Sequence, residues 1–126
     1  MEKQVKLLLV DDDERNIFAL SAYLKVKKYL VSTAKDGQEC LTKLSESDYD
    51  VILLDMMMPV MDGFQTLAVM RKDSKLKDNK VIALTALAMK GDMERCIEAG
   101  ADDYCTKPVD IDLLVSKINR LIQPNG

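Results

Sequence analysis

The sequence contains no histidine among its 126 residues, and this absence excludes several classes of protein. Without histidine, neither a Ser-His-Asp triad nor a Cys-His nucleophile pair can form. The chain also cannot be a histidine kinase or a phosphohistidine carrier. Any phosphoryl group that it carries must therefore come from another molecule.

Cysteines and long apolar runs are also scarce. The three cysteines, Cys40, Cys96 and Cys105, are odd in number and form no CxxC pair, so we expect buried thiols in a reducing compartment rather than disulfides or a zinc site. The apolar run at residues 7–10 is too short for a signal peptide, and no run approaches the ~20 apolar residues that span a bilayer. These features predict a soluble, cytoplasmic protein that does not bind membranes.

The charge balance shows no basic excess, which argues against binding nucleic acid by itself. The chain has 18 basic and 21 acidic side chains, a net charge of -3. The longest basic cluster, Lys25, Lys27 and Lys28, falls near the end of a predicted helix, where it complements the helix dipole. The length predicts one domain over 1–126, with a core at about 4–122 and a frayed tail at 123–126.

Apolar runs alternate with segments of helical spacing. The runs cover 5–10, 30–34, 51–54 and 81–84, with a weaker one at 103–106. Most are continuous, which is typical of parallel strands covered on both faces. In the segments between and after these runs, apolar residues recur with the spacing of one helix face: Ile17/Leu20/Leu24, Leu41/Leu44, Leu67/Met70 and Leu114/Ile118/Leu121/Ile122. The pattern predicts an α/β fold, a (βα)5 doubly wound parallel sheet, for which the flavodoxin-like strand order is 2-1-3-4-5.

Local signals support these element boundaries. Asp36-Gly37 and Asp62-Gly63 predict turns before the second and third helices. Gly100 is placed to end the fourth helix, and Asp110 to cap the fifth at its amino terminus.

Polar residues of particular types gather where the predicted strands end. Asp11, Asp12 and Asp13 follow the first strand, Asp55 ends the third, Thr85 the fourth and Lys107 the fifth. The carboxyl ends of parallel strands form the ligand-binding edge of such sheets.

Carboxylates that converge on one point repel each other unless a cation intervenes, and Mg²⁺ prefers such ligands together with phosphate oxygens. An Asp carboxylate can attack a phosphoryl donor, while the metal and a lysine stabilise the transferring oxygens. A threonine hydroxyl can hydrogen-bond the phosphate that forms. The cluster therefore predicts phosphoryl transfer.

Four motifs make the chain resemble the receiver domains of bacterial response regulators, a superfamily that includes the chemotaxis-Y-like proteins. They are LLLVDDDERN at the first strand, VILLDMMMPVMDG at the third, VIALTA at the fourth and GADDYCTKP at the fifth. The resemblance covers essentially the whole chain, in the family's order and spacing. It implies two-component or phosphorelay signalling, in which a histidine kinase or a histidine phosphotransfer protein is the phosphoryl donor.

The resemblance also implies a role for individual residues. Asp55 would be the phosphoacceptor, and Mg²⁺, for which Mn²⁺ can substitute, would be bound by Asp11, Asp12, Asp55 and the backbone carbonyl of Met57. Lys107 would contact the phosphate, and its bond to Pro108 would be cis. Thr85 would be the switch hydroxyl whose movement Tyr104 follows, which would alter the face formed by the fourth helix, fifth strand and fifth helix.

The resemblance implies a signalling module rather than an enzyme, with only self-catalysed phosphotransfer and self-dephosphorylation. Met57 and Leu87 occupy the two variable positions that flank the path of the attacking water, and both are apolar, so we expect slow loss of phosphate.

The region LAMKGDMERCIEAGADDY is similar to receivers of the single-domain and hybrid-kinase kinds. The output would be a downstream protein target or an attached domain. Leu113 stands where regulators that dimerise usually have an acid, although Lys117 and Asp103 still suit that interface; we expect a monomer or weak dimer.

Two other functions remain as alternatives. A haloacid-dehalogenase-like phosphatase would use Asp11 as nucleophile and Asp13 as general acid, but Arg15 occupies the Thr/Val position of its signature, and the simpler reading of Asp13 is a helix cap. A flavodoxin-like FMN binder would need a Ser/Thr/Gly-rich phosphate loop after the first strand, where three aspartates stand instead.

Overall fold

A central sheet of five parallel strands organises the fold. The structure, a computed structural model, describes residues 4–86 and 89–123. The strands are β1 (Lys6–Val10), β2 (Leu30–Ala34), β3 (Val51–Asp55), β4 (Val81–Thr85) and β5 (Asp103–Thr106). Their order is β2-β1-β3-β4-β5, and every neighbouring pair is parallel. The predicted fold class and strand order are confirmed.

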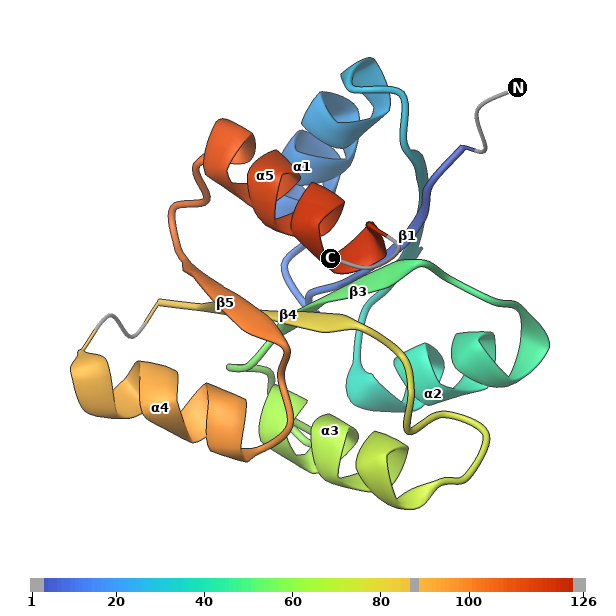
Figure 1. The fold of residues 1–126 in the computed structure, drawn as a ribbon, viewed down its shortest axis with the longest axis vertical. Coiled ribbons are helices and arrows are strands. Elements are labelled where there is room, and N and C mark those ends of the chain that lie inside the picture. Colours follow the sequence, from blue (N-terminus) through green and yellow to red (C-terminus); the bar gives the residue numbers. More distant parts are fainter. Residues whose placement is uncertain (1–3, 87–88, 124–126) are drawn as a thin grey trace.

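Five helices connect and cover the strands. They are α1 (Glu14–Val26), α2 (Gly37–Glu46), α3 (Gly63–Lys72), α4 (Lys90–Glu98) and α5 (Ile111–Ile122). Helices α1 and α5 lie on one face of the sheet, and α2, α3 and α4 lie on the other (Figure 1). Within the described part of the chain, no helix combines the length and the apolar character needed to cross a membrane.

The alternation of side chains along the strands divides the core into two layers. Leu8, Ile52 and Leu54 belong to the layer that contains the buried residues of α2, α3 and α4. Leu7 and Leu53 belong to the other layer, under α1 and α5. The central strands β3 and β4 are buried along their whole length, which explains their continuous apolar sequence.

The helix caps predicted at Asp13 and Asp110 are present, and each side chain accepts backbone N–H bonds in the first turn of α1 or α5. Asp36 and Asp62, predicted only as parts of turns, cap α2 and α3 in the same way. Gly100 has a φ of 116°, and its N–H donates to the Ile97 carbonyl as α4 ends.

The predictions of a cis Lys107-Pro108 bond and of buried, free cysteines are confirmed, whereas the prediction of a frayed tail stays open. The Lys107-Pro108 bond is cis. The three cysteines are buried and free. Most of the predicted frayed tail, residues 124–126, lies outside the described residues.

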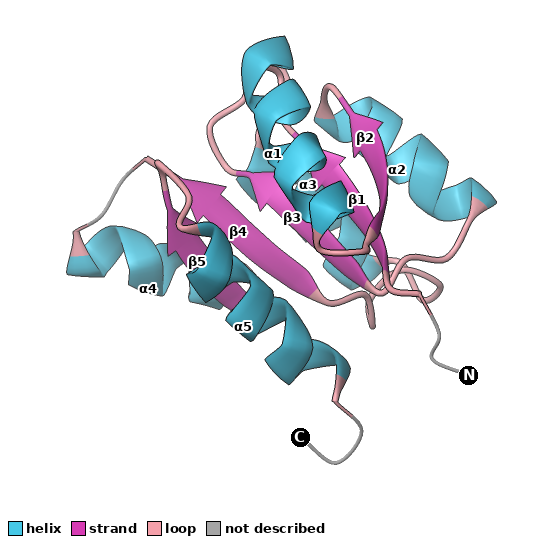
Figure 2. Cartoon of the chain, turned by 90° about the horizontal axis from the view of Figure 1, so that it is seen from above, coloured by secondary structure: helices cyan, strands magenta, loops and turns pink. Residues whose placement is uncertain are grey.

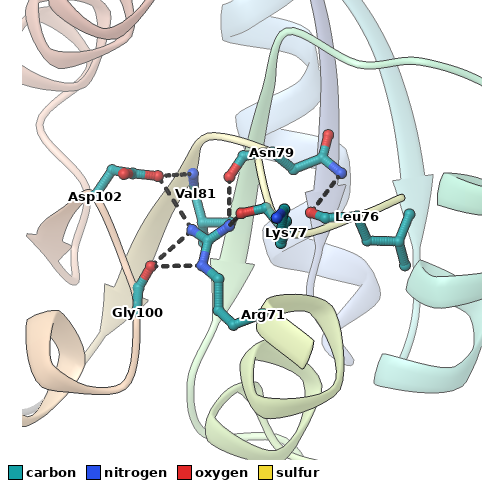
Figure 3. A network of polar contacts seen from close by, with 7 residues as sticks. All are labelled: Arg71, Leu76, Lys77, Asn79, Val81, Gly100 and Asp102. Atoms are coloured by element: carbon teal, nitrogen blue, oxygen red, sulfur yellow. Dashed lines mark hydrogen bonds and ion pairs between the residues drawn. The ribbon is translucent and has the colours of Figure 1, made fainter. Parts of the chain in front are cut away.

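Arg71 is the centre of a network of polar contacts (Figure 3). Its partners lie in the loops before β4 and β5, at the end of the strands opposite Asp55 and Thr85. Its guanidinium donates twice to the Gly100 carbonyl, at 3.0 and 2.7 Å, and to the carbonyls of Lys77 and Asn79, both at 2.7 Å. It also contacts Asp102 Oδ2 at 3.2 Å. The end of α3 is thereby tied to the loops that precede β4 and β5.

Candidate functional site

Four strand ends bring the predicted site residues to one edge of the sheet. Asp11 directly follows β1, Asp55 and Thr85 are the last residues of β3 and β4, and Lys107 follows β5. Because β1, β3, β4 and β5 are consecutive neighbours in the sheet, these positions lie side by side. Figure 2 shows the arrowheads of the strands directed toward this edge. Strand order therefore assembles residues that are far apart in the sequence.

Lys107 bridges the two buried carboxylates of this cluster. Its Nζ atom lies 3.1 Å from Asp11 Oδ2 and 3.3 Å from Asp55 Oδ2. Asp11 and Asp55 are only 2% and 3% exposed. A single ammonium group thus holds the ends of β1 and β3 together electrostatically.

The remaining carboxylate oxygens are oriented by the backbone. Asp11 Oδ1 accepts a hydrogen bond from the N–H of Asp13, and Asp55 Oδ1 accepts one from the N–H of Met57, both at 2.9 Å. These bonds limit rotation of the two carboxylates. They leave the acids preorganised at the edge of the sheet.

The acidic cluster has the donor set of a divalent cation site. Ligand oxygens of Asp11, Asp12 and Asp55 all lie within 4.8 Å of one another, and Asp12 is exposed. Three carboxylates against one lysine leave an excess of negative charge. Mg²⁺ fits such a site because it prefers carboxylate oxygens and retains several waters.

Burial perturbs the titration of both members of the central ion pair. Burial raises the pKa of Asp55, as does the neighbouring Asp11, whereas the Met57 N–H and Lys107 act in the opposite direction. Burial alone would lower the pKa of Lys107, but its hydrogen bond to Asp11 and its attraction to Asp55 raise it overall. Lys107 is therefore held firmly in its charged form.

Thr85 and Tyr104 occupy neighbouring strands beside the acids. Thr85 is buried at the end of β4, and its carbonyl accepts a hydrogen bond from the Lys107 N–H at 2.8 Å. Tyr104 is half-buried in β5, opposite Ala83, two residues before Thr85. The two predicted switch residues thus lie on adjacent strands, β4 and β5, at the site.

Of the two apolar residues predicted to limit access of the attacking water, the structure describes only Met57. Met57 is 55% exposed and lies two residues after Asp55, the last residue of β3. Leu87 lies outside the described residues.

The structure weakens the phosphatase alternative. The Asp13 side chain accepts hydrogen bonds from the backbone N–H groups of Arg15 and Asn16, so it caps α1. That role was the simpler sequence interpretation. A capping carboxylate occupied by two backbone donors is poorly placed to act as a general acid.

Sequence reasoning missed a close contact at the end of β3, next to Asp55. A Cβ atom on Gly63 would lie 2.6 Å from Met56 Cα and 2.7 Å from the Asp55 carbonyl oxygen. The start of α3 therefore packs directly on the backbone that carries Asp55. The Asp62-Gly63 pair indicated a turn, but no local signal indicated what the glycine would touch.

Comparison with known proteins identifies the family. A profile of the response regulator receiver domain matches residues 7–119. The chain is 40% identical over 116 residues to the response regulator PleD of Caulobacter vibrioides. The aligned region covers 92% of this chain and 26% of PleD. The chain spans about half or less of the length of the curated relatives that it matches.

Two solved structures are similar in fold over almost the whole chain. One is the receiver domain of the sensor histidine kinase PA1611 from Pseudomonas aeruginosa, with a magnesium ion coordinated in its active site cleft (33% identity, TM-score 0.87, 95% of this chain and 98% of that one). The other is the receiver domain of Saccharomyces cerevisiae Ssk1 in complex with the histidine phosphotransfer protein Ypd1 (27%, 0.85, 96% and 90%). The family match and the acid cluster at the edge of a 2-1-3-4-5 sheet agree, and the chain belongs to the response regulator receiver domain family.

Proposed function

We propose that this chain is a single receiver domain that accepts a phosphoryl group on Asp55 in a Mg²⁺-dependent reaction. The observation that carries the proposal is the bridge from Lys107 to the buried carboxylates of Asp11 and Asp55. It brings the acceptor, a metal-binding acid and a fixed positive charge to one point. An ordinary surface ion pair would not require two buried aspartates at the same strand ends.

In the proposed reaction, an Asp55 oxygen attacks phosphorus, the bond from phosphorus to the donor breaks, and an acyl phosphate forms. The Met57 N–H orients the Asp55 carboxylate for attack. Asp11, Asp12, Asp55 and the Met57 carbonyl would hold the Mg²⁺, which neutralises charge on the transferring oxygens. Lys107 would keep its positive charge beside the new phosphate, and Thr85 would donate a hydrogen bond to it.

The proposed donor is a phosphohistidine on a histidine kinase or a phosphotransfer protein. The absence of histidine supports a donor on another molecule, and the similarity to the Ssk1 receiver, which was solved with Ypd1, supports the class. The output would be a separate protein target or an attached domain. We further propose that the protein acts in the cytoplasm as a signalling module with slow self-dephosphorylation.

The proposed consequence of phosphorylation is a rearrangement of the face formed by α4, β5 and α5. Thr85 would move toward the phosphate, and the Tyr104 ring would shift in response. Such a change is a shift between two packings, driven by contacts that the phosphate makes in only one of them.

The central test compares two Asp→Asn substitutions. With Mg²⁺ and acetyl phosphate or phosphoramidate, the wild type should gain one hydroxylamine-sensitive acyl phosphate, and Asp55→Asn should gain none. Asp13→Asn is the matched control because Asn also caps helices well, so it should label normally.

The same pair of variants distinguishes phosphate acceptance on Asp55 from phosphatase activity. Stable labelling of Asp55→Asn at another residue would refute the acceptor assignment. Steady turnover of a phosphomonoester that Asp13→Asn abolishes would instead favour the phosphatase.

A further inference from the structure

One ammonium group contacts Tyr104 at two places. Lys117, on α5, donates a hydrogen bond from Nζ to the Tyr104 carbonyl at 2.6 Å. The same Nζ lies 4.7 Å from the centroid of the Tyr104 ring, within the range of a cation–π contact. The lysine therefore holds both the backbone and the ring of this residue.

The buried Asp103 carboxylate anchors Lys117 in this position. Asp103 Oδ1 lies 3.0 Å from Lys117 Nζ and also accepts the N–H of Tyr104 at 2.8 Å. The other oxygen, Oδ2, pairs with Arg120, one turn further along α5. The Asp103 side chain is only 8% exposed, and a buried carboxylate is costly without its cations. Lys117 is therefore not a freely moving surface lysine.

Tyr104 also belongs to a hollow on the surface. Tyr104 lines this hollow together with residues of α4, including Met93 and Ile97. The ring also packs against the core layer under α2, α3 and α4. The orientation of one half-buried ring thus decides part of the shape of the surface between α4 and β5.

We propose that Lys117 is a positioning residue that holds the Tyr104 ring in the orientation it has here, with Asp103 as its anchor. This inference rests on the proposed switch function, and it assigns Lys117 the role of setting how readily the switch moves. A ring that turns away from Lys117 loses the cation–π contact. Removing the ammonium group should therefore favour the moved orientation by at least about twofold.

The experiment follows the ring signals of Tyr104 by NMR in the full chain, assigned with a Tyr104→Phe variant. Lys117→Met removes the charge and keeps an unbranched side chain. Arg120→Met is the matched control, because it removes the other cation of Asp103 without a described contact to Tyr104. Lys117→Arg keeps the charge and can stack on the ring.

We expect Lys117→Met to shift the Tyr104 ring signals, Lys117→Arg to stay near the wild type and Arg120→Met to have little effect. Unchanged signals in Lys117→Met would overturn the proposal. An equal shift in Arg120→Met would also overturn it, because the effect would then come from the charge on Asp103 and not from the ring contact. If Lys117→Met does not fold, Lys117→Gln is judged by the same criterion.

A second measurement separates this inference from the proposed function. Beryllofluoride, a phosphoryl mimic, is titrated with Mg²⁺ while the same ring signals are followed. The midpoint should fall by at least about twofold in Lys117→Met relative to Arg120→Met, following the loss of the cation–π contact. Equal midpoints would refute a role of Lys117 in the switch. If the Tyr104 signals of the wild type do not change when beryllofluoride is added, the proposed switch is refuted. The comparison of variants without beryllofluoride would still test the contact between Lys117 and the Tyr104 ring.

Discussion

Replacing Arg71 by methionine should destabilise the fold by about 3 kcal/mol without altering the acidic site. Arg71 uses all five of its N–H donors, on the carbonyls of Gly100, Lys77 and Asn79 and on the Asp102 carboxylate (Figure 3). Methionine keeps the apolar stem of the side chain and loses every one of these bonds. The substitution therefore isolates the polar network.

The magnitude depends on how well water can replace the lost bonds. The two bonds to Gly100 and the one to Asn79 are partly buried, and each is worth about 1 kcal/mol. The bonds to Lys77 and Asp102 are exposed, so their net contribution is close to zero. For a domain of this size, the loss corresponds to a fall in melting temperature of about 10 °C.

Lysine at the same position should recover little of this stability. Its single ammonium group has three donors at one point, whereas the acceptors of Arg71 belong to two separate loops. We expect Arg71→Lys to remain about 2 kcal/mol less stable than the wild type.

Thermal and urea denaturation, followed by circular dichroism, would measure these differences. Lys72→Met is the matched control, because Lys72 is an exposed cation that follows Arg71 on the same helix. Well below the melting temperature, Arg71→Met should still accept phosphate, because the network lies at the other end of the strands from Asp55. A loss of stability no larger than that of Lys72→Met would refute the reasoning.

Four further outcomes are expected. Mg²⁺ should raise the melting temperature by relieving carboxylate repulsion, and Asp12→Ala should remove most of the rise; an unchanged rise would argue against Asp12 as a ligand. Gly63→Ala should slow phosphorylation, since its Cβ would lie 2.7 Å from the carbonyl oxygen of Asp55, the proposed acceptor, and a folded variant that labels at the wild-type rate would contradict this. A Met57→Asn, Leu87→Glu double mutant should lose phosphate faster than the wild type, because polar side chains can orient the attacking water; equal or longer retention would disprove the argument. Burial raises the pKa of the Cys40 thiol to about 12, so a thiol reagent at about pH 8 should label it only after unfolding, and labelling in native buffer would count against its burial.

The secondary structure could be predicted because its signals are local. Apolar runs, helical spacing and Asp caps operate over a few residues, and the predicted strands and the caps predicted at Asp13 and Asp110 are present. The predicted first strand began one residue early, at Val5, where hydrophobicity continues although the pairing of β1 with β2 begins at Lys6. Periodicity alone does not determine the strand order, and the order 2-1-3-4-5 was expected only as that of the flavodoxin-like folds with this pattern.

The composition of the acidic site could also be predicted, but its contacts could not. Asp11, Asp55, Thr85 and Lys107 stood at predicted strand ends, and parallel strands end at one edge. Whether Lys107 would contact one carboxylate, both or neither depended on side-chain geometry. The bridge at 3.1 and 3.3 Å comes from the tertiary structure alone.

The sequence by itself determined the alternating elements, their caps and the types of residue available for phosphoryl chemistry. Only the tertiary structure decided that Arg71 would use all its donors, that Gly63 would pack on the backbone of Asp55 and Met56, and that Lys117 would lie against the Tyr104 ring. The physical reason is distance along the chain. Local propensity is set by neighbouring residues, whereas these contacts join segments that meet only when helices pack on the completed sheet.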